Sequence, residues 1–218
     1  EAGTPAELVH GNRRPPPRIV VRGDRLLEGE TDWVDGLPVT TAARTAFDIG
    51  RRLTVTAAVP RIDALMNATG LTVEEIAAVA AAHRGSRGLR ALSESLSLVD
   101  GGAESPYESM TRMLLVQNGF PRPETQIRVL DGNRVVVARL DMGWRRWRVG
   151  VDFDGAHHWT DSRQRNRDIE RYALLPELGW TDQDTWLDWV DWGGPGFTYP
   201  GTGYYLVPST YGAEFDTP

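Results

Sequence analysis

The sequence predicts an α+β protein whose mainly helical N-terminal part is followed by a helix, three strands and a second helix. Two observations lead to this fold class. Residues 55–99 form three segments of helical composition, separated by Gly70 and Gly85. Residues 125–154 instead alternate apolar and polar side chains, which is the period of a strand with one buried face.

The composition fits a soluble globular protein, with 218 residues, 40% of them hydrophobic and 25% charged. The net charge of −6 argues against indiscriminate binding to nucleic acid, although it leaves room for a local basic face. The absence of cysteine excludes disulfides and thiolate metal sites. No signal peptide and no apolar run of about 20 residues is visible, so we expect a cytoplasmic protein with no membrane partner.

Residues 1–54 are expected to form short strands that lead into a helix. Ile19–Arg22 and Trp33–Val39 have strand composition and are separated by Gly and Asp turns. The run that follows reads as a helix start, because threonines precede a stretch with helical apolar spacing. Arg44 and Asp48 lie four residues apart in it, and we expect them to form a surface ion pair.

The same run carries a first family resemblance. Its letters, VTTAARTAFD, resemble the VT-x-x-x-RT-x-x-D segment of the abortive-infection AbiEi-type antitoxin family. The resemblance implies that a cognate toxin or another protein is a partner of the chain.

Residues 55–100 are expected to be a helical connector. Its predicted helices are Val55–Asn67, Thr72–His83 and Gly88–Val99. Thr72 followed by Glu75 is the pattern of a capping box, and Pro60 is expected to disturb the first helix.

A domain boundary is predicted at residues 100–102, and a helix opens soon after it. Ser105 can cap this helix and Pro106 suits its first turn, so we expect it to run to about Asn118. Glu104 and Glu108 flank the helix start. Acids there either stabilise the helix dipole or, for one of them, point into an acidic cluster.

Three strands are predicted next, at Thr125–Leu130, Arg134–Met142 and Arg145–Asp154. An Asp-Gly-Asn turn joins the first two, and a Gly-Trp turn precedes the third. Asp141 and Asp152 then lie on neighbouring strands and face the same side of the sheet. Two such carboxylates repel each other, which a bound cation would relieve, although a solvated sheet face would show the same pattern.

Histidines and an arginine-bearing helix follow the third strand. His157 and His158 come just after it, and the expected helix 161–178 places three arginines on one side. These are Arg163, Arg167 and Arg171. Acids, histidines and arginines are what a metal-dependent phosphodiesterase needs, although the histidines also suit a structural pair at a turn. A zinc site is disfavoured, because adjacent side chains on an extended strand point apart.

Residues 103–180 combine several motifs. They are an acid in the first helix, Leu-Asp ending one strand, acid-x-Asp-Gly-x-x-His on the next, R-x-R-x-R-D-x-x-R, and Leu-Gly-Trp. This combination resembles the very-short-patch-repair (Vsr)-like endonuclease branch of the PD-(D/E)XK superfamily, in particular actinobacterial proteins that join such a domain to an AbiEi-type region. The resemblance implies a restriction-endonuclease-like αβββα core with a mixed sheet, in a domain spanning 101–180.

The resemblance also implies roles for individual residues. Asp141 matches the acid of the PD motif, and Asp152 matches the acid of the (D/E)XK motif. Asp154 stands where the superfamily has lysine, a departure that this branch shares. His158 matches the histidine of the branch, and Asp168 belongs to the D-x-x-R motif of the last helix.

The implied activity is metal-dependent hydrolysis of phosphodiester bonds in DNA. Mg²⁺, or Mn²⁺ in its place, would be held by Asp141, Asp152 and the first-helix acid, which is Glu108 or else Glu104. His158 would move a proton near neutral pH. The DNA contacts would come from Arg163, Arg167, Arg171 and His157.

The end of the chain leaves a second function open. Residues 181–218 show no helical or strand period and contain no arginine, so we expect an irregular tail in place of the family's final strand. Losing that strand would expose a sheet edge and could inactivate the site. The alternative function is a catalytically inactive DNA-binding or antitoxin module, in an oligomeric state that the sequence leaves unspecified.

Overall fold

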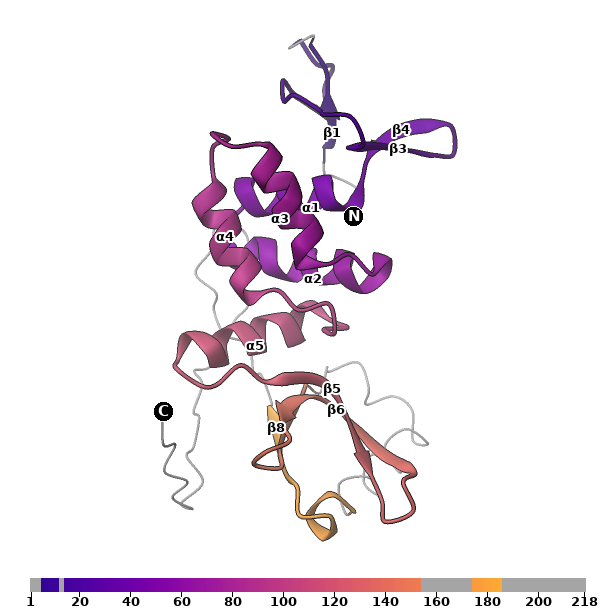
Figure 1. Cartoon of the computed structure of the whole chain (residues 1–218), viewed down its shortest axis with the longest axis vertical. Helices are drawn as coiled ribbons and strands as arrows, with labels where there is room; N and C mark the ends of the chain where they lie inside the picture. Colours follow the sequence, from indigo (N-terminus) through magenta and orange to yellow (C-terminus); the bar gives the residue numbers. More distant parts are fainter. Residues whose placement is uncertain (1–4, 12–13, 154–173, 186–218) are drawn as a thin grey trace. The chain divides into compact units, whose positions relative to one another are not determined.

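The computed structural model describes residues 5–11, 14–153 and 174–185. The chain divides into two compact units, Glu1–Gly101 and Gly102–Pro218, and each is described by itself. The first unit is mainly helical and the second carries the larger sheet, which confirms the predicted α+β class (Figure 1).

Helices form the body of the first unit (Figure 1). They are α1 (Ala42–Arg52), α2 (Val55–Thr69), α3 (Val73–Ala82) and α4 (Leu89–Leu98). α1 contacts each of the other three and is therefore the central element. The core between them contains the buried side chains of Phe47, Val59, Ile62, Ile76 and Leu92. The helices predicted between residues 55 and 99 are confirmed, with ends close to the predicted ones.

Local sequence signals set the ends of these helices. Thr72 and Glu75 form the predicted capping box, in which each side chain accepts a bond from the other residue's backbone N–H. Thr41 caps α1 by accepting a bond from the backbone N–H of Arg44. Pro60 lies inside α2 and is buried, so the disturbance expected from it does not end the helix.

Two small sheets precede the helices. Their strands are β1 (Ala6–Val9), β2 (Ile19–Arg22), β3 (Thr31–Val34) and β4 (Leu37–Thr40). β1 and β2 run parallel, whereas β3 and β4 form an antiparallel hairpin. The single strand predicted for Trp33–Val39 is wrong, because the chain turns back at Asp35 and Gly36. Both residues have positive φ, 51° and 77°, which is the backbone of the two-residue turn that Asp-Gly favours.

In its described residues the second unit combines helix α5 with a four-stranded mixed sheet (Figure 1). Its elements are α5 (Pro106–Gln117), β5 (Glu124–Leu130), β6 (Val136–Trp144), β7 (Val149–Phe153) and β8 (Thr181–Thr185). β5, β6 and β7 form an antiparallel meander, and β8 runs parallel to β7 at the edge. The predicted helix and three strands are confirmed, and residues 174–177 are helical as well.

Alternating side chains of this sheet supply its core. Ile127 and Val129 of β5 pack with Leu140 of β6 and with Leu175, which follows the gap in the described chain. A second group joins Met142 of β6 to α5 and β7. The polar side chains at the positions between these residues are therefore directed to the opposite side of the strands.

The turn between β6 and β7 differs from the prediction. Instead of turning at Gly143 and Trp144, β6 continues through both residues, and β7 begins only at Val149. Gly143 permits this pairing, because a Cβ there would lie 2.2 Å from the carbonyl oxygen of Val149. The turn is thus made by residues 145–148, which are rich in arginine.

The tail also begins differently from the prediction. Residues 181–185 form β8, which pairs with β7 along its length from Thr181 opposite Val149 to Thr185 opposite Phe153. These residues lack an apolar alternation, so the strand was not visible in the sequence. Backbone pairing with β7 creates it, and the edge expected to be exposed on β7 is covered.

None of the helices in the described part of the chain has the length and apolar character needed to span a bilayer.

Candidate functional site

Asp141 on β6 and Asp152 on β7 lie side by side in the sheet of the second unit. The register pairs Met142 with Val151, which places the two aspartates opposite each other on neighbouring strands. The backbone N–H of Asp141 donates to Asp152 Oδ1 at 2.8 Å. Asp152 is only 5% exposed, so a solvated sheet face does not describe its surroundings.

Glu108 brings a third carboxyl group to this region from α5. It is buried, and its Oε2 accepts bonds from the backbone N–H of Glu104 at 2.9 Å and from Gln126 Nε2 at 3.3 Å. Burial raises the pKa of the Glu108 carboxyl above its ordinary value of 4.5. The negative charge of Asp141 acts in the same direction, which shows that the two carboxyl groups influence each other.

The structure separates the two acids at the start of α5. Glu104 is exposed and forms a two-bond ion pair with Arg139, with both distances 2.8 Å. Glu108 is buried, and the negative charge of Asp141 contributes to raising its pKa. Of the two candidates for the first-helix acid, Glu108 is therefore the one that belongs to the carboxylate cluster.

Gln126 is a member of this cluster for which the sequence gives no signal. Its side chain donates to Glu108, and its backbone has a φ of 52° within β5. Such left-handed values are uncommon for residues other than glycine and often occur where a side chain is held for function. In the sequence Gln126 is one polar position of an alternating strand, so only the fold reveals its partner.

The donor chemistry of this cluster suits Mg²⁺, which prefers carboxylate oxygens. Within the described ranges, however, no three His, Cys, Asp or Glu residues are placed to hold one ion together. The structure therefore provides a pair of aspartates, Asp141 and Asp152, with Glu108 near them. In the described residues these carboxyl groups do not make up a metal site, and the Mg²⁺ site stays a prediction.

The other residues predicted for the site lie outside the described residues. They are Asp154, His157, His158, Arg163, Arg167, Asp168 and Arg171. Their roles as acid, proton carrier and DNA contacts stay predictions.

A second cluster of buried charges lies in the first unit. Arg44 is 1% exposed and donates to Glu30 Oε2 at 2.5 Å and to Asp48 Oδ2 at 3.0 Å. His83 Nε2 lies 2.5 Å from the other oxygen of Glu30. The predicted surface pair of Arg44 and Asp48 is therefore wrong in its location. Glu30, from the segment before β3, and His83, from the end of α3, close over it and make it internal.

The pKa shifts in this cluster favour the charged forms of its side chains. Burial by itself would raise the pKa of Glu30, but hydrogen bonds from the Leu27 N–H, His83 and Arg44 outweigh it and lower the pKa below 4.5. The carboxylates of Asp48 and Glu30 likewise outweigh burial and raise the pKa of Arg44. Because each buried charge contacts an opposite one, this cluster serves the fold.

The β3–β4 hairpin exposes apolar side chains on both of its faces. It extends away from the helices of its unit (Figure 1). Trp33 is 70% exposed, and Val34 and Leu37 are 54% and 66% exposed. Trp33 faces one side, while Val34 and Leu37 form a cross-strand pair on the other. Two exposed acids, Asp32 and Asp35, give the hairpin a negative charge.

Comparison with known proteins gives a match to the first unit. Residues 3–98 match the family model described as the AbiEi antitoxin C-terminal domain, which confirms the antitoxin-like character predicted for this region. The matched range lies within the first unit, and the endonuclease resemblance of the second unit stays a prediction.

Two curated relatives are proteins of Mycobacterium tuberculosis, from two strains, each named as an uncharacterized protein. Each is 33% identical to this chain over 148 residues, which is 68% of this chain and 54% of the relative. The chain thus spans about half the length of these relatives. No solved structure matches it.

Proposed function

We propose that the first unit is an antitoxin-type regulatory module that acts by binding a protein, a cognate toxin. The match of residues 3–98 to an antitoxin domain is the observation that carries this proposal. The matched range includes both the helical core and the β3–β4 hairpin.

The hairpin favours a protein as the partner of this unit. Apolar side chains as exposed as Trp33 and Leu37 lose solvent contact when a partner covers them, and such aromatic residues often dominate protein interfaces. Asp32 and Asp35 would repel a phosphate backbone, so the hairpin is unsuited to DNA. An apolar surface bordered by basic residues on the toxin would complement it.

A growth assay tests this function. Genes that flank the coding sequence are expressed singly from an inducible promoter, with and without the full chain. We expect one of them to arrest growth and the chain to restore colony formation. The antitoxin function is contradicted when no flanking gene that arrests growth is countered by the chain.

The same assay locates the binding surface. The double substitution Trp33→Ser and Leu37→Ser should abolish rescue while leaving the amount of folded chain unchanged. Trp147→Ala, which removes an exposed tryptophan from the second unit, should leave rescue intact. Rescue by the hairpin variant at the wild-type level would exclude the hairpin and leave the antitoxin function standing.

The second candidate function, for the second unit, is that of a metal-dependent DNA endonuclease. The observation that favours it is the carboxylate cluster of Asp141, Asp152 and Glu108. A divalent ion bound there would offset the negative charge of a phosphodiester undergoing hydrolysis. Asp141 and Asp152 would supply ligand oxygens, and Gln126 would hold the Glu108 carboxyl in position.

Nicking of supercoiled plasmid with Mg²⁺ or Mn²⁺ tests this candidate. Asp141→Asn and Asp152→Asn should abolish nicking, and Glu108→Gln should lower it strongly. Glu104→Gln is the matched control, because it removes an acid from the same helix start whose partner is Arg139. Absence of nicking by folded wild-type chain on duplex, single-stranded and mismatched DNA would reject the enzyme and favour an inactive DNA-binding module.

A further inference from the structure

The turn between β6 and β7 concentrates arginine and tryptophan side chains. We call residues 144–148, with the sequence Trp-Arg-Arg-Trp-Arg, the basic-aromatic turn. It contains no acid, in a chain whose net charge is −6. Residues 145–148 are all exposed, and Trp147 is 40% exposed.

Aromatic contacts hold the turn on the body of the second unit. Trp144 packs against the apolar group that contains Met142, and its Nε1 donates to the carbonyl oxygen of Pro121 at 2.9 Å. Its ring lies 6.3 Å from that of Phe120 and 6.3 Å from that of Trp147. Trp144 therefore supports the turn, and Trp147, which meets the Trp144 ring edge-on at 63°, is the outer ring of this aromatic group.

The arginines of the turn are held in different ways. Arg145 pairs with Glu124 at 2.9 Å, and Arg148 donates to the carbonyl oxygen of Leu178 at 3.2 Å. Arg146 instead lies over the ring of Trp147, 5.6 Å from its centre. In the described part of the chain no carboxylate forms an ion pair with Arg146. Its charge is thus available to an anion that approaches the exposed tryptophan.

We propose that the basic-aromatic turn binds unpaired nucleotides, with a base stacking on Trp147 and phosphates contacting Arg146 and its neighbours. Base stacking on an aromatic ring beside cationic groups is the usual chemistry of single-strand binding. A paired base cannot offer its face to the ring, so the turn selects unpaired over duplex nucleic acid.

This inference rests on the proposed function in one respect: nucleic acid is taken as the ligand because the second unit is proposed to act on DNA. It requires neither a metal ion nor cleavage, and it can hold in a catalytically inactive protein. It also assigns a role to residues that lie outside the carboxylate cluster and on a different segment from the predicted arginine helix.

A binding assay in buffer containing a chelator tests the proposal. Fluorescence anisotropy is measured for the full chain with labelled oligo(dT) of about 12 nucleotides, and with an abasic strand of equal length. The two strands carry the same phosphates but differ in bases. We expect oligo(dT) to bind more tightly than the abasic strand and than the duplex of the same length.

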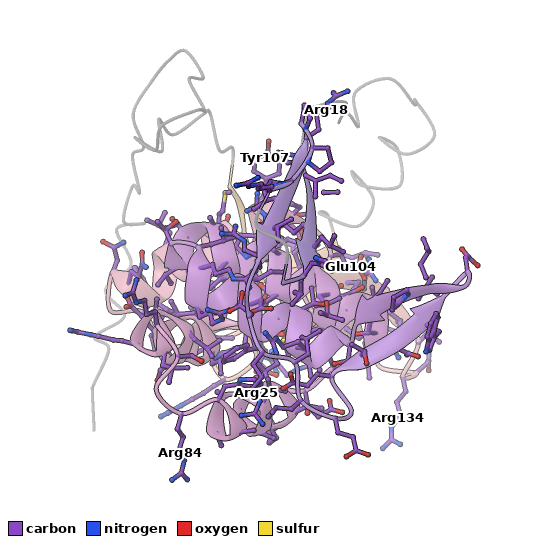
Figure 2. The ribbon with its side chains drawn as sticks, turned by 90° about the horizontal axis from the view of Figure 1, so that it is seen from above. Arg18, Arg25, Arg84, Glu104, Tyr107 and Arg134 are labelled. Atoms are coloured by element: carbon purple, nitrogen blue, oxygen red, sulfur yellow. The ribbon has the colours of Figure 1, made fainter. Side chains whose placement is uncertain are left out.

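Substitutions place the interaction on the turn. Trp147→Ala should weaken binding of oligo(dT) by roughly 5- to 150-fold, the range for loss of one stacked base, whereas Trp147→Phe should retain most of it. Trp33→Ala is the control for an exposed tryptophan elsewhere. Arg146→Gln should weaken binding and lower its salt dependence. Its control is Arg134→Gln, in the turn that precedes β6, whose side chain extends away from the ribbon (Figure 2).

Equal binding of the abasic strand would overturn the proposal, since it would show a phosphate site without stacking. Equal loss of binding in the Trp33 and Trp147 variants would overturn it as well. Unchanged binding by Trp147→Ala, with wild-type circular dichroism, would place any single-strand site elsewhere. The chain could also fail to bind any strand while the toxin covers the turn in their complex. That result would overturn the proposal and assign the turn to a protein partner.

Discussion

Each unit of the chain buries a cluster of charged side chains, and the two clusters are built in opposite ways. In the first unit Arg44 lies between Glu30 and Asp48, and the pKa of Glu30 is lowered. In the second unit burial raises the pKa of Glu108, and the like charge of Asp141 acts in the same direction. Both carboxyl groups are buried, but at Glu30 the hydrogen bonds and the opposite charge outweigh burial, whereas at Glu108 burial prevails and the like charge of Asp141 adds to it.

This difference in neighbouring charge distinguishes a cluster that stabilises the fold from one that can bind a cation. A buried charge with an opposite partner has its requirements met within the fold, and its loss damages the fold. A group of like charges is strained when all its members are ionised, and a cation relieves that strain. We therefore assign the first cluster to the stability of the antitoxin-like unit, whereas the second is the one to which we propose that a cation binds.

The largest effect is expected from Arg44→Met. The substitution leaves Glu30 and Asp48 buried without their central cation, which should lower the free energy of unfolding by about 3–5 kcal/mol. Urea unfolding followed by circular dichroism measures it. Arg84→Met is the control, because this exposed side chain extends into solvent (Figure 2) and its loss should change stability by less than about 0.5 kcal/mol. Equal effects of both substitutions would contradict the structural role.

The second prediction concerns the effect of acidic pH on the stability that Glu30 contributes. Because the folded pKa of Glu30 lies below its ordinary value of 4.5, its contribution to stability is present above pH 4.5 and is lost as the pH falls through the folded pKa. Glu30→Gln should therefore be less stable than wild type at pH 7, and the gap should close in acid. Urea unfolding at a series of pH values measures this. A gap that stays constant with pH would contradict the charge-based account.

The third prediction is the opposite pH dependence of stability at Glu108. Because the folded pKa of Glu108 lies above 4.5, the stability that its protonated form contributes is present below pH 4.5 and is lost as the pH rises through the folded pKa. In metal-free buffer Glu108→Gln should thus raise the melting temperature at pH 7 and have little effect in acid. Calorimetry of the full chain measures the shift. Destabilisation at pH 7 would show that the ionised carboxylate is needed by the fold.

The smallest effect on stability is expected at the hairpin. Trp33 is 70% exposed, so Trp33→Ser should change the free energy of unfolding by less than about 0.5 kcal/mol. Thermal unfolding measures it, beside the rescue assay in which the hairpin double variant should fail. A large loss of stability would mean that Trp33 supports the fold and would weaken its assignment to a partner surface.

The sequence predicted elements whose signals are local. The capping box of Thr72 and Glu75 and the Ser105–Pro106 start of α5 depend on a few adjacent residues, and both formed as expected. Alternation likewise placed Asp141 and Asp152 on neighbouring strands. These features could be predicted because the interacting groups lie close together in the chain or follow a fixed period.

Some errors concern local turns, such as Asp35-Gly36 within the predicted strand Trp33–Val39, but most concern features that depend on distant residues. Arg44 and Asp48 look like a surface pair until Glu30 and His83 cover them. The strand at residues 181–185 has no apolar period and exists through its pairing with β7. Gln126 joins the carboxylate cluster because β5 places it beside Glu108, a relation that spacing in the sequence does not contain.

Site-resolved NMR titration of the Glu30 and Glu108 carboxyl groups tests the contrast between the clusters most directly. In metal-free buffer the account predicts that Glu30 titrates below 4.5 and Glu108 above it. Added Mg²⁺ should lower the pKa of Glu108 and leave that of Glu30 unchanged. Shifts of both groups in one direction, or a Glu108 pKa that does not respond to Mg²⁺, would contradict the division between a structural and a binding cluster.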